Sequence, residues 1–116
     1  MSMAKDKDLP IDLHFVKKEA LDKFPLVTDL TIEEMSCYDY IVRGEGSLFS
    51  GYFERTIYPI SRTMGSIIYI ERFGEEQIVL PTNEWYMAKE EDLNDDTLEE
   101  PPYNFYYHEK KRRGLL

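Results

Sequence analysis

The N-terminal part of the chain has apolar positions at helical spacing. An apolar residue recurs every three or four positions, at Leu13, Val16, Ala20 and Phe24. This spacing gives an α-helix one apolar stripe. Asp12 suits the position that caps a helix start, and Pro25 ends the segment because the residue before a proline avoids helical angles. The pattern predicts a first helix over residues 12–24, after a polar lead-in at residues 1–10.

A second helix is predicted to begin at Thr31. Thr31 and Glu34 have the spacing of a capping box, in which each side chain accepts a hydrogen bond from the other residue's backbone amide. An apolar stripe follows, at Ile32, Met35, Tyr38 and Val42. Gly44 suits the position just after a helix end. Residues 38–42 would also suit a strand, so both interpretations of that stretch stay open.

From residue 48 onward the pattern is typical of strands. Residues 48–58 are rich in aromatic and β-branched side chains, and Pro59 closes this run. Residues 66–72 and 77–80 flank the short glycine-containing loop 73–76. This arrangement predicts a β-hairpin.

The C-terminal part of the chain is harder to assign. Residues 85–88 fit a further strand or the start of a helix equally well. An acidic loop follows at residues 89–102. The aromatic run at 103–109 has the composition of a last strand, and residues 110–116 form a basic tail.

Together these elements predict an α+β fold with two N-terminal helices packed on a small, mainly antiparallel β-sheet. Short connections favour antiparallel pairing, because parallel strands need a crossover of a dozen or more residues. The chain of 116 residues fits one domain, 1–116, in which residues 11–88 hold the helices and then the β-region. Its 42% hydrophobic content supplies one core.

The net charge of −9 is unevenly distributed. Residues 89–100 carry Lys89 and seven carboxylates, whereas residues 101–116 carry four basic residues and one acid, Glu109. The acidity is therefore a local feature, and an acidic surface attracts basic partners.

The expected location is the cytoplasm. Cys37 is the only cysteine and has no partner for an internal disulfide. No stretch approaches the roughly 18 apolar residues that span a bilayer, so no membrane association is expected. The charged residues 1–8 lack the apolar core of a signal peptide.

No catalytic or phosphate-binding motif stands out. His14 and His108 are the only histidines, and neither has a cysteine or serine signature beside it. Gly44 and Gly46 lack the third glycine of a dinucleotide loop, because Phe49 stands at its position. The expectation is a protein without catalytic residues or cofactor.

A calcium site is suggested and then excluded by one segment. Asp92, Asn94 and Asp96 match the first three ligand positions of an EF-hand loop. Thr97 then replaces the required glycine, and Tyr103 replaces the closing glutamate. No metal site is expected.

Direct nucleic-acid binding is also not expected. Aromatic residues of the β-region could form a stacking platform, namely Tyr52, Phe53, Tyr58, Tyr69 and Phe73. Phosphates, however, demand a basic surface, and this chain is acidic. DNA mimicry by carboxylates would need a continuous acidic face, whereas 14 lysines and arginines are interspersed.

A partner-binding site is predicted where acids and aromatics adjoin. Tyrosine and tryptophan are enriched among interface anchors. The candidate residues are Glu90, Glu91, Asp92, Asp95, Asp96, Trp85, Tyr86, Tyr103, Phe105 and Tyr106. The alternative is that the aromatics belong to the core and the acids form a solvated loop.

The sequence therefore favours a non-enzymatic binding domain that engages, and inhibits, a basic or nucleic-acid-handling protein. Toxin-neutralising immunity factors and phage-encoded host antagonists are of this physical type. The alternative is a structural subunit of a larger complex or virion, with self-association left open. A small enzyme is the third interpretation.

Overall fold

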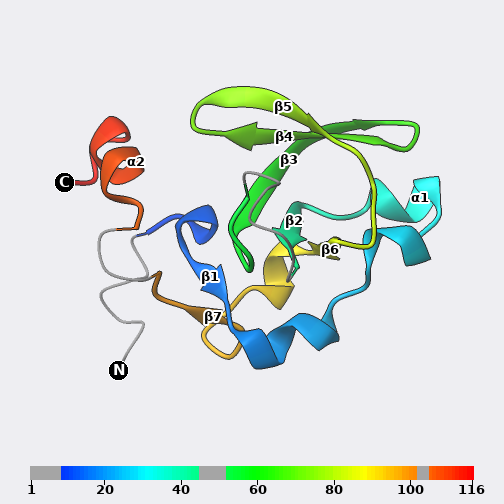
Figure 1. Ribbon diagram of the computed structural model, residues 1–116, viewed down its shortest axis with the longest axis horizontal. Coiled ribbons are helices and arrows are strands. Elements are labelled where there is room, and N and C mark those ends of the chain that lie inside the picture. The colour runs from blue at the N-terminus through cyan, green and yellow to red at the C-terminus, as the bar shows by residue number, and fades with distance from the viewer. Residues whose placement is uncertain (1–8, 45–51, 102–104) are drawn as a thin grey trace.

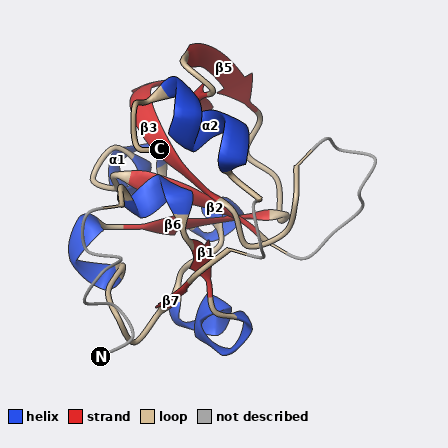
Figure 2. Ribbon diagram, turned by 90° about the vertical axis from the view of Figure 1, so that its left-hand side faces the viewer, coloured by secondary structure: helices blue, strands red, loops and turns tan. Residues whose placement is uncertain are grey.

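The structure is a computed structural model that describes residues 9–44, 52–101 and 105–116. Its centre is a five-stranded antiparallel sheet in the order β5-β4-β3-β2-β6, accompanied by the two-stranded sheet β1-β7 (Figures 1 and 2). The strands are β1 Phe15–Val16, β2 Tyr40–Arg43, β3 Ile57–Met64, β4 Ile67–Arg72, β5 Glu75–Val79, β6 Trp85–Ala88 and β7 Leu98–Glu99. The α-helices are α1 Ile32–Met35 and α2 Tyr107–Arg112, and the 3-10 helices are η2 Ile11–Leu13, η3 Lys18–Lys23, η4 Val27–Asp29 and η6 Glu90–Asp92.

The prediction of two N-terminal helices packed on the sheet is wrong, because the described chain is mostly sheet with only short helices. Residues 12–24 form η2, β1 and η3 instead of one α-helix. Four consecutive residues are buried, Leu13, His14, Phe15 and Val16, and a helix with one apolar face cannot bury four residues in a row. An extended segment can, because its two sides face different neighbours. Phe15 accordingly pairs with both Glu99 and Thr56.

The second helix begins as predicted but lasts one turn. Thr31 Oγ1 accepts the Glu34 amide at 3.1 Å, and Glu34 Oε1 accepts the Thr31 amide at 2.8 Å, so the capping box is confirmed. The helix ends at Met35, and residues 40–43 form the strand β2. Gly44 therefore follows a strand. A Cβ there would lie 2.7 Å from Tyr86 Cε1, a distance that excludes a larger side chain without rearrangement.

The predicted hairpin is confirmed, with a tighter turn. Ile68 pairs with Val79, and the ladder continues to Arg72 and Glu75. Only Phe73 and Gly74 remain between the strands, with φ values of 54° and 82°. Positive φ at both positions is the geometry of a two-residue turn that matches the right-handed twist of its strands.

Strand β3 runs through Pro59, where the sequence indicated a strand end. Pro59 lies in register with Tyr40 of β2. The next residue, Ile60, donates its amide to Asp39 O at 3.0 Å. Amides alternate in direction along a strand, so the nitrogen of Pro59, which carries no hydrogen, faces β4. Pairing between β3 and β4 begins only at Ile60. The proline removes no bond to β2.

The C-terminal segment is a helix where the sequence predicted a strand and then a tail. Within 103–109, residues 103 and 104 lie outside the described part of the chain. Residues 107–112 form α2, and Glu109 bonds to Arg112 and Arg113 on its next turn. These i,i+3 and i,i+4 pairs stabilise a helix. The open choice for residues 85–88 is settled as the strand β6, which pairs with β2.

The central strands are buried on both faces. Ile41, Tyr58 and Met87 belong to one core cluster, whereas their neighbours Val42, Ile57 and Ala88 belong to another. Residues of β1, η3 and β7 cover the second cluster, and residues of η4, α1 and the β4–β5 hairpin cover the first. A third cluster joins Leu13 and Phe15 to Tyr106, which ties the start of α2 to the N-terminal segment.

The register of the hairpin can be tested with a pair of isoleucines. Ile68 is fully buried, whereas Ile78 on the other side of the sheet is 56% exposed. We expect Ile68→Ala to lower the free energy of unfolding by about 2–5 kcal/mol and Ile78→Ala by less than about 1 kcal/mol. Urea denaturation at pH 7 measures both. Equal losses would contradict the observed register.

Candidate functional site

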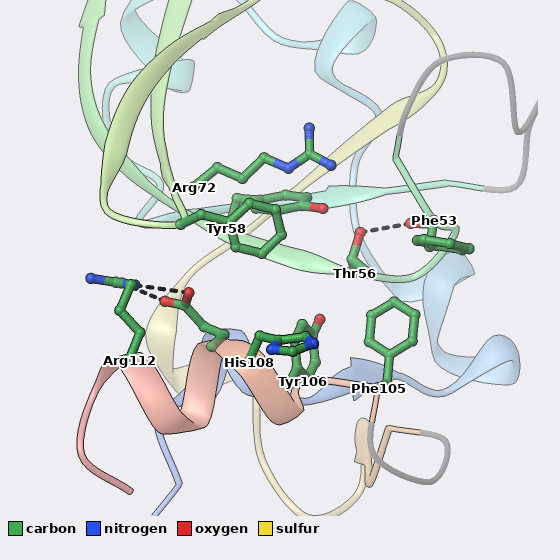
Figure 3. Close-up of a pocket in the computed structure, with 10 residues that line it drawn as sticks. Phe53, Thr56, Tyr58, Arg72, Phe105, Tyr106, His108 and Arg112 are labelled. Carbon is green, nitrogen blue, oxygen red and sulfur yellow. Dashed lines mark hydrogen bonds and ion pairs between the residues drawn. The ribbon is translucent and has the colours of Figure 1, made fainter.

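A pocket of about 420 Å³ opens between α2 and the β3–β4 part of the sheet (Figure 3). Its aromatic lining consists of Phe53, Tyr58, Phe73, Phe105 and Tyr106. Its polar lining consists of Thr56, Arg72, His108, Glu109 and Arg112. We call it the aromatic pocket. Its volume is that of a small-ligand site or of the hole that receives one side chain of a partner.

One wall of the pocket is a network of edge-to-face aromatic rings. The centre of the Phe105 ring lies 5.0 Å from the ring centre of Phe53, 5.0 Å from that of Phe15 and 4.8 Å from that of Tyr106. In each pair the ring planes are close to perpendicular. Such pairs contribute beyond their buried area. Because Phe15 and Tyr106 are buried, the wall is anchored in the core of the protein.

The opposite wall combines an arginine with tyrosine and phenylalanine rings. The Arg72 guanidinium carbon lies 4.2 Å from the Tyr52 ring centre, 5.1 Å from that of Phe73 and 5.8 Å from that of Tyr58. Cations favour such positions over ring faces. Burial raises the pKa of Tyr58 and of Tyr106, so both hydroxyls stay neutral at physiological pH. The wall therefore offers flat apolar surface beside one fixed positive charge.

Beneath the pocket, four charged side chains hold α2 in place. Glu109 Oε1 accepts Arg112 Nε at 3.0 Å, and Glu109 Oε2 accepts Arg113 Nε at 2.6 Å. Arg113 also donates to Asp12, with Nη2 to Oδ2 at 2.6 Å. We call these four residues the ion-pair network. Hydrogen bonds from Arg112 are the main cause of the lowered pKa of the buried Glu109. The network joins η2 to the C-terminal helix.

Phe73 stands in an unfavourable position at the pocket rim. Its φ of 54° lies in the left-handed region, which costs a residue with a bulky side chain about 1–2 kcal/mol. Asparagine or glycine is preferred there in such a turn. The Phe73 side chain is also 55% exposed, so it gains little from burial in return.

The structure divides the residues that the sequence grouped into one partner site. Trp85 is buried in the core, with its ring 5.0 Å from Tyr52. Tyr86, the next residue of β6, packs on the opposite face of the sheet. Phe105 and Tyr106 line the aromatic pocket, and Tyr103 lies outside the described residues. The aromatic candidates thus occupy separate places.

The acidic candidates lie together on the surface. The five carboxylates Glu90, Glu91, Asp92, Asp95 and Asp96 are all exposed. The buried Thr97 fixes their loop, since its hydroxyl donates to Asp92 O at 2.8 Å and accepts the Asn94 amide at 3.0 Å. A groove of about 240 Å³ runs beside them, where Lys23 and Phe24 meet the loop. All seven carboxylates of the predicted acidic loop lie within residues 89–100, and from here on the name acidic loop refers to residues 89–100.

The pocket residues that sequence reasoning missed are the polar ones, namely Thr56, Arg72, His108, Glu109 and Arg112. The aromatic platform inferred from composition did include Phe53, Tyr58 and Phe73, and all three line the aromatic pocket. The spacing of Glu109 to Arg112 and Arg113 is the sequence signal that indicates a helix here. The position of Glu109 and Arg112 beside Arg72 at one pocket depends on tertiary structure.

The described residues give little support for a metal site, for catalysis by histidine or for a membrane-spanning helix. No group of three or more histidine, cysteine or acidic side chains there is arranged to hold a metal ion. His14 is buried, with Nδ1 at 3.2 Å from Pro10 O, and His108 lies at the pocket against the Tyr107 ring. None of the helices in the described ranges combines the length and apolar character needed to cross a bilayer.

Comparison with known protein families, with curated proteins and with solved structures gives no match.

The ion-pair network predicts a pH dependence of stability. The folded-state pKa of Glu109 lies below its unfolded value, so its contribution is present above about pH 4.5 and is lost as pH falls through the lowered pKa. We expect Glu109→Gln to reduce the free energy of unfolding at pH 7 by about 1–3 kcal/mol and to flatten the loss between pH 5 and 3. Urea titrations at each pH measure this, with exposed Glu91→Gln as the control. An unchanged slope in Glu109→Gln would contradict the role of the network.

Proposed function

We propose that the protein is a non-enzymatic binding domain whose aromatic pocket receives an apolar side chain of a partner protein. The pocket supplies flat apolar surface on two walls and a few fixed polar groups, namely Arg72, His108 and the ion-pair network. Such a combination suits recognition, because apolar area provides affinity while the polar groups set orientation.

The observation that carries this proposal is Phe73. An exposed phenylalanine with a positive φ costs free energy in the isolated protein. Strain of this kind clusters at ligand-binding positions. A partner that covers the Phe73 ring would bury the apolar surface that the isolated fold leaves in water.

A protein partner is favoured over a small molecule by the rim of the pocket. Phe53 and Phe73 line the pocket, and they are 53% and 55% exposed. Their exposed parts extend aromatic surface beyond the pocket itself. Binding hot spots combine a central hole with surrounding contacts that exclude water, and a small ligand in the pocket would leave this rim in water.

The proposal is tested by Phe73→Asn. Asparagine suits the turn, so we expect the free energy of unfolding to rise by about 0.5–1 kcal/mol. Peptides selected from a displayed random library on the full chain should carry an aromatic or large aliphatic residue, and the variant should weaken their affinity about tenfold or more. Ile78→Ser is the matched control, because Ile78 is equally exposed but lies outside the pocket lining. Selected peptides that bind Phe73→Asn and the parent chain equally would overturn the proposal.

A second candidate is binding of a basic protein through the acidic loop, in the manner of an immunity factor or host antagonist. It is favoured by the five exposed carboxylates on a loop that Thr97 holds in one shape. Preformed charge of this kind accelerates association with a basic partner. A cytoplasmic location belongs to this proposal, since the exposed Cys37 is unpaired and suits a reducing compartment.

The two candidates predict different losses. Replacing Glu90, Glu91 and Asp92 by their amides should abolish salt-sensitive capture of a basic partner, while Phe73→Asn leaves it intact. Quantitative mass spectrometry of proteins retained by the parent chain and both variants, at 50 mM and 1 M salt, measures this. Capture that survives the amide variant and high salt would remove the acidic loop from consideration.

A further inference from the structure

We infer that the outer edge of β5 binds an extended segment of a different protein, in which an apolar residue stands two positions before a basic residue. The added segment lies antiparallel to β5 and extends the five-stranded sheet by one strand. This surface is separate from the aromatic pocket, so the inference goes beyond the proposed function and does not rest on it.

Strand β5 is the edge of the five-stranded sheet that the described chain leaves open (Figure 1). At the other edge, β6 is covered, because Met87 donates its amide to Pro25 O at 3.0 Å and Tyr86 forms a bridge with Leu26. Among the described residues, the backbone of β5 pairs only with β4. Unpaired N–H and C=O groups along an edge are a template for one more strand.

The two-residue turn determines which peptide groups of β5 face outward. Arg72 and Glu75 close this turn, and in such a hairpin the closing residues bond to each other. Bond directions alternate along a strand. The N–H and C=O groups of Gln77 therefore face β4, like those of Glu75, whereas those of Glu76 and Ile78 face outward.

A side-chain hydrogen bond on the neighbouring strand agrees with this assignment. Tyr69 of β4 pairs with Ile78, so its peptide groups should face β3 if those of Ile78 face outward. The Tyr69 carbonyl does accept a hydrogen bond from the β3 side, from Ser61 Oγ at 3.3 Å. The free edge of β5 thus offers two N–H and two C=O groups, at Glu76 and Ile78.

The side chains beside these groups define the chemistry of the added strand. Ile78 is 56% exposed and lies in one row with Tyr69. Glu76 lies directly opposite Glu71, and facing like charges destabilise a sheet. Arg62 Nη2 pairs with Glu76 Oε1 at 3.2 Å, but no ion pair in the described part of the chain involves the exposed Glu71. This second row holds two carboxylates and one guanidinium.

Arg112, the cation on the α2 side of this row, is already bound elsewhere. Its pKa is raised first by its hydrogen bond to Glu109 and least by the charge of Glu71. A basic residue on an added strand, next to Glu76, supplies the opposite charge that the row lacks. An apolar residue two positions away then lies next to Ile78.

The direction of the added strand follows from the sheet. All four ladders of the five-stranded sheet are antiparallel, and antiparallel pairing is slightly more stable per residue than parallel pairing. In an antiparallel partner the residue opposite Ile78 comes before the residue opposite Glu76. The order in the partner is therefore apolar first and basic second.

A second copy of the chain fits this edge less well than a basic strand. Strand β5 has no lysine or arginine. In an antiparallel pair of two β5 strands, the residue opposite Glu76 would be Glu76, Ile78 or Leu80 of the copy, and none of these is basic. The glutamates therefore act against self-pairing, as charges on edge strands commonly do.

Hydrogen exchange and peptide titration of the full chain, both followed by NMR, test the inference. In the free protein the amides of Glu76 and Ile78 should exchange with solvent much faster than those of Gln77 and Val79. A seven-residue peptide of threonines, with valine third and lysine fifth, should slow exchange at Glu76 and Ile78. Glutamate in place of the lysine should weaken binding about three- to tenfold at 0.1 M salt. Exchanging the positions of valine and lysine should also weaken it.

Matched variants locate the effect. Glu71→Lys should remove most of the preference for lysine over glutamate, and Glu91→Lys should leave it unchanged, although both make the same change of charge at exposed positions. Phe73→Asn should bind these peptides as the parent chain does, so a failure here is distinct from a failure of the aromatic pocket.

Four results would overturn the inference. They are no binding of the lysine peptide, equal affinity for the lysine and glutamate peptides, slowed exchange at amides other than those of Glu76 and Ile78, and the same lysine preference in Glu71→Lys. Slowed exchange at Glu76 and Ile78 that grows with protein concentration, without peptide, would place a second copy at the edge and overturn the assignment to a different protein.

Discussion

The burial of strand β2 on both faces is the constraint on which the rest of this fold depends. Ile41 and Val42 point to opposite sides of the sheet, and neither is accessible to water. Each face therefore needs its own cover. The chain supplies one cover from β1, η3 and β7 and the other from η4, α1 and the curled β4–β5 hairpin. A small protein that covers a sheet on both sides has few residues left for long helices.

This constraint explains which features could be predicted from sequence. Thr31 with Glu34, and the hairpin around Gly74, depend on neighbours a few residues away, and both were predicted. Leu13, Val16, Ala20 and Phe24 were identified as an apolar set, and all four are buried. Their helical spacing was misleading because β7 and Thr56 flank Phe15. These partners lie some 40 and 80 residues along the chain, so no local pattern shows them.

The residues of the candidate sites divide in the same way. Some have positions that follow from the local sequence, and others have positions set by contacts with distant parts of the chain. The exposure of the acidic residues at 90–96 follows from their composition, which was visible at once. The positions of Trp85 and Phe105 depend on packing, and the structure sends one to the core and the other to the aromatic pocket. The pocket itself joins the segment before β3, the β4–β5 turn and α2. Sequence reasoning recognised its rings by type, but their convergence requires the fold.

The attachment of α2 has a consequence for the role proposed for the aromatic pocket. Tyr106 packs on Leu13 and Phe15, and Arg113 is bonded to Asp12, so η2 and β1 hold one side of the helix. The helix α2 belongs to neither sheet. Undocking of α2 would therefore be a local opening that leaves the strand pairing in place. For a partner that binds as proposed, only the docked state offers both walls of the pocket, so the docked fraction would scale the affinity and contacts on the far side of the helix would influence binding.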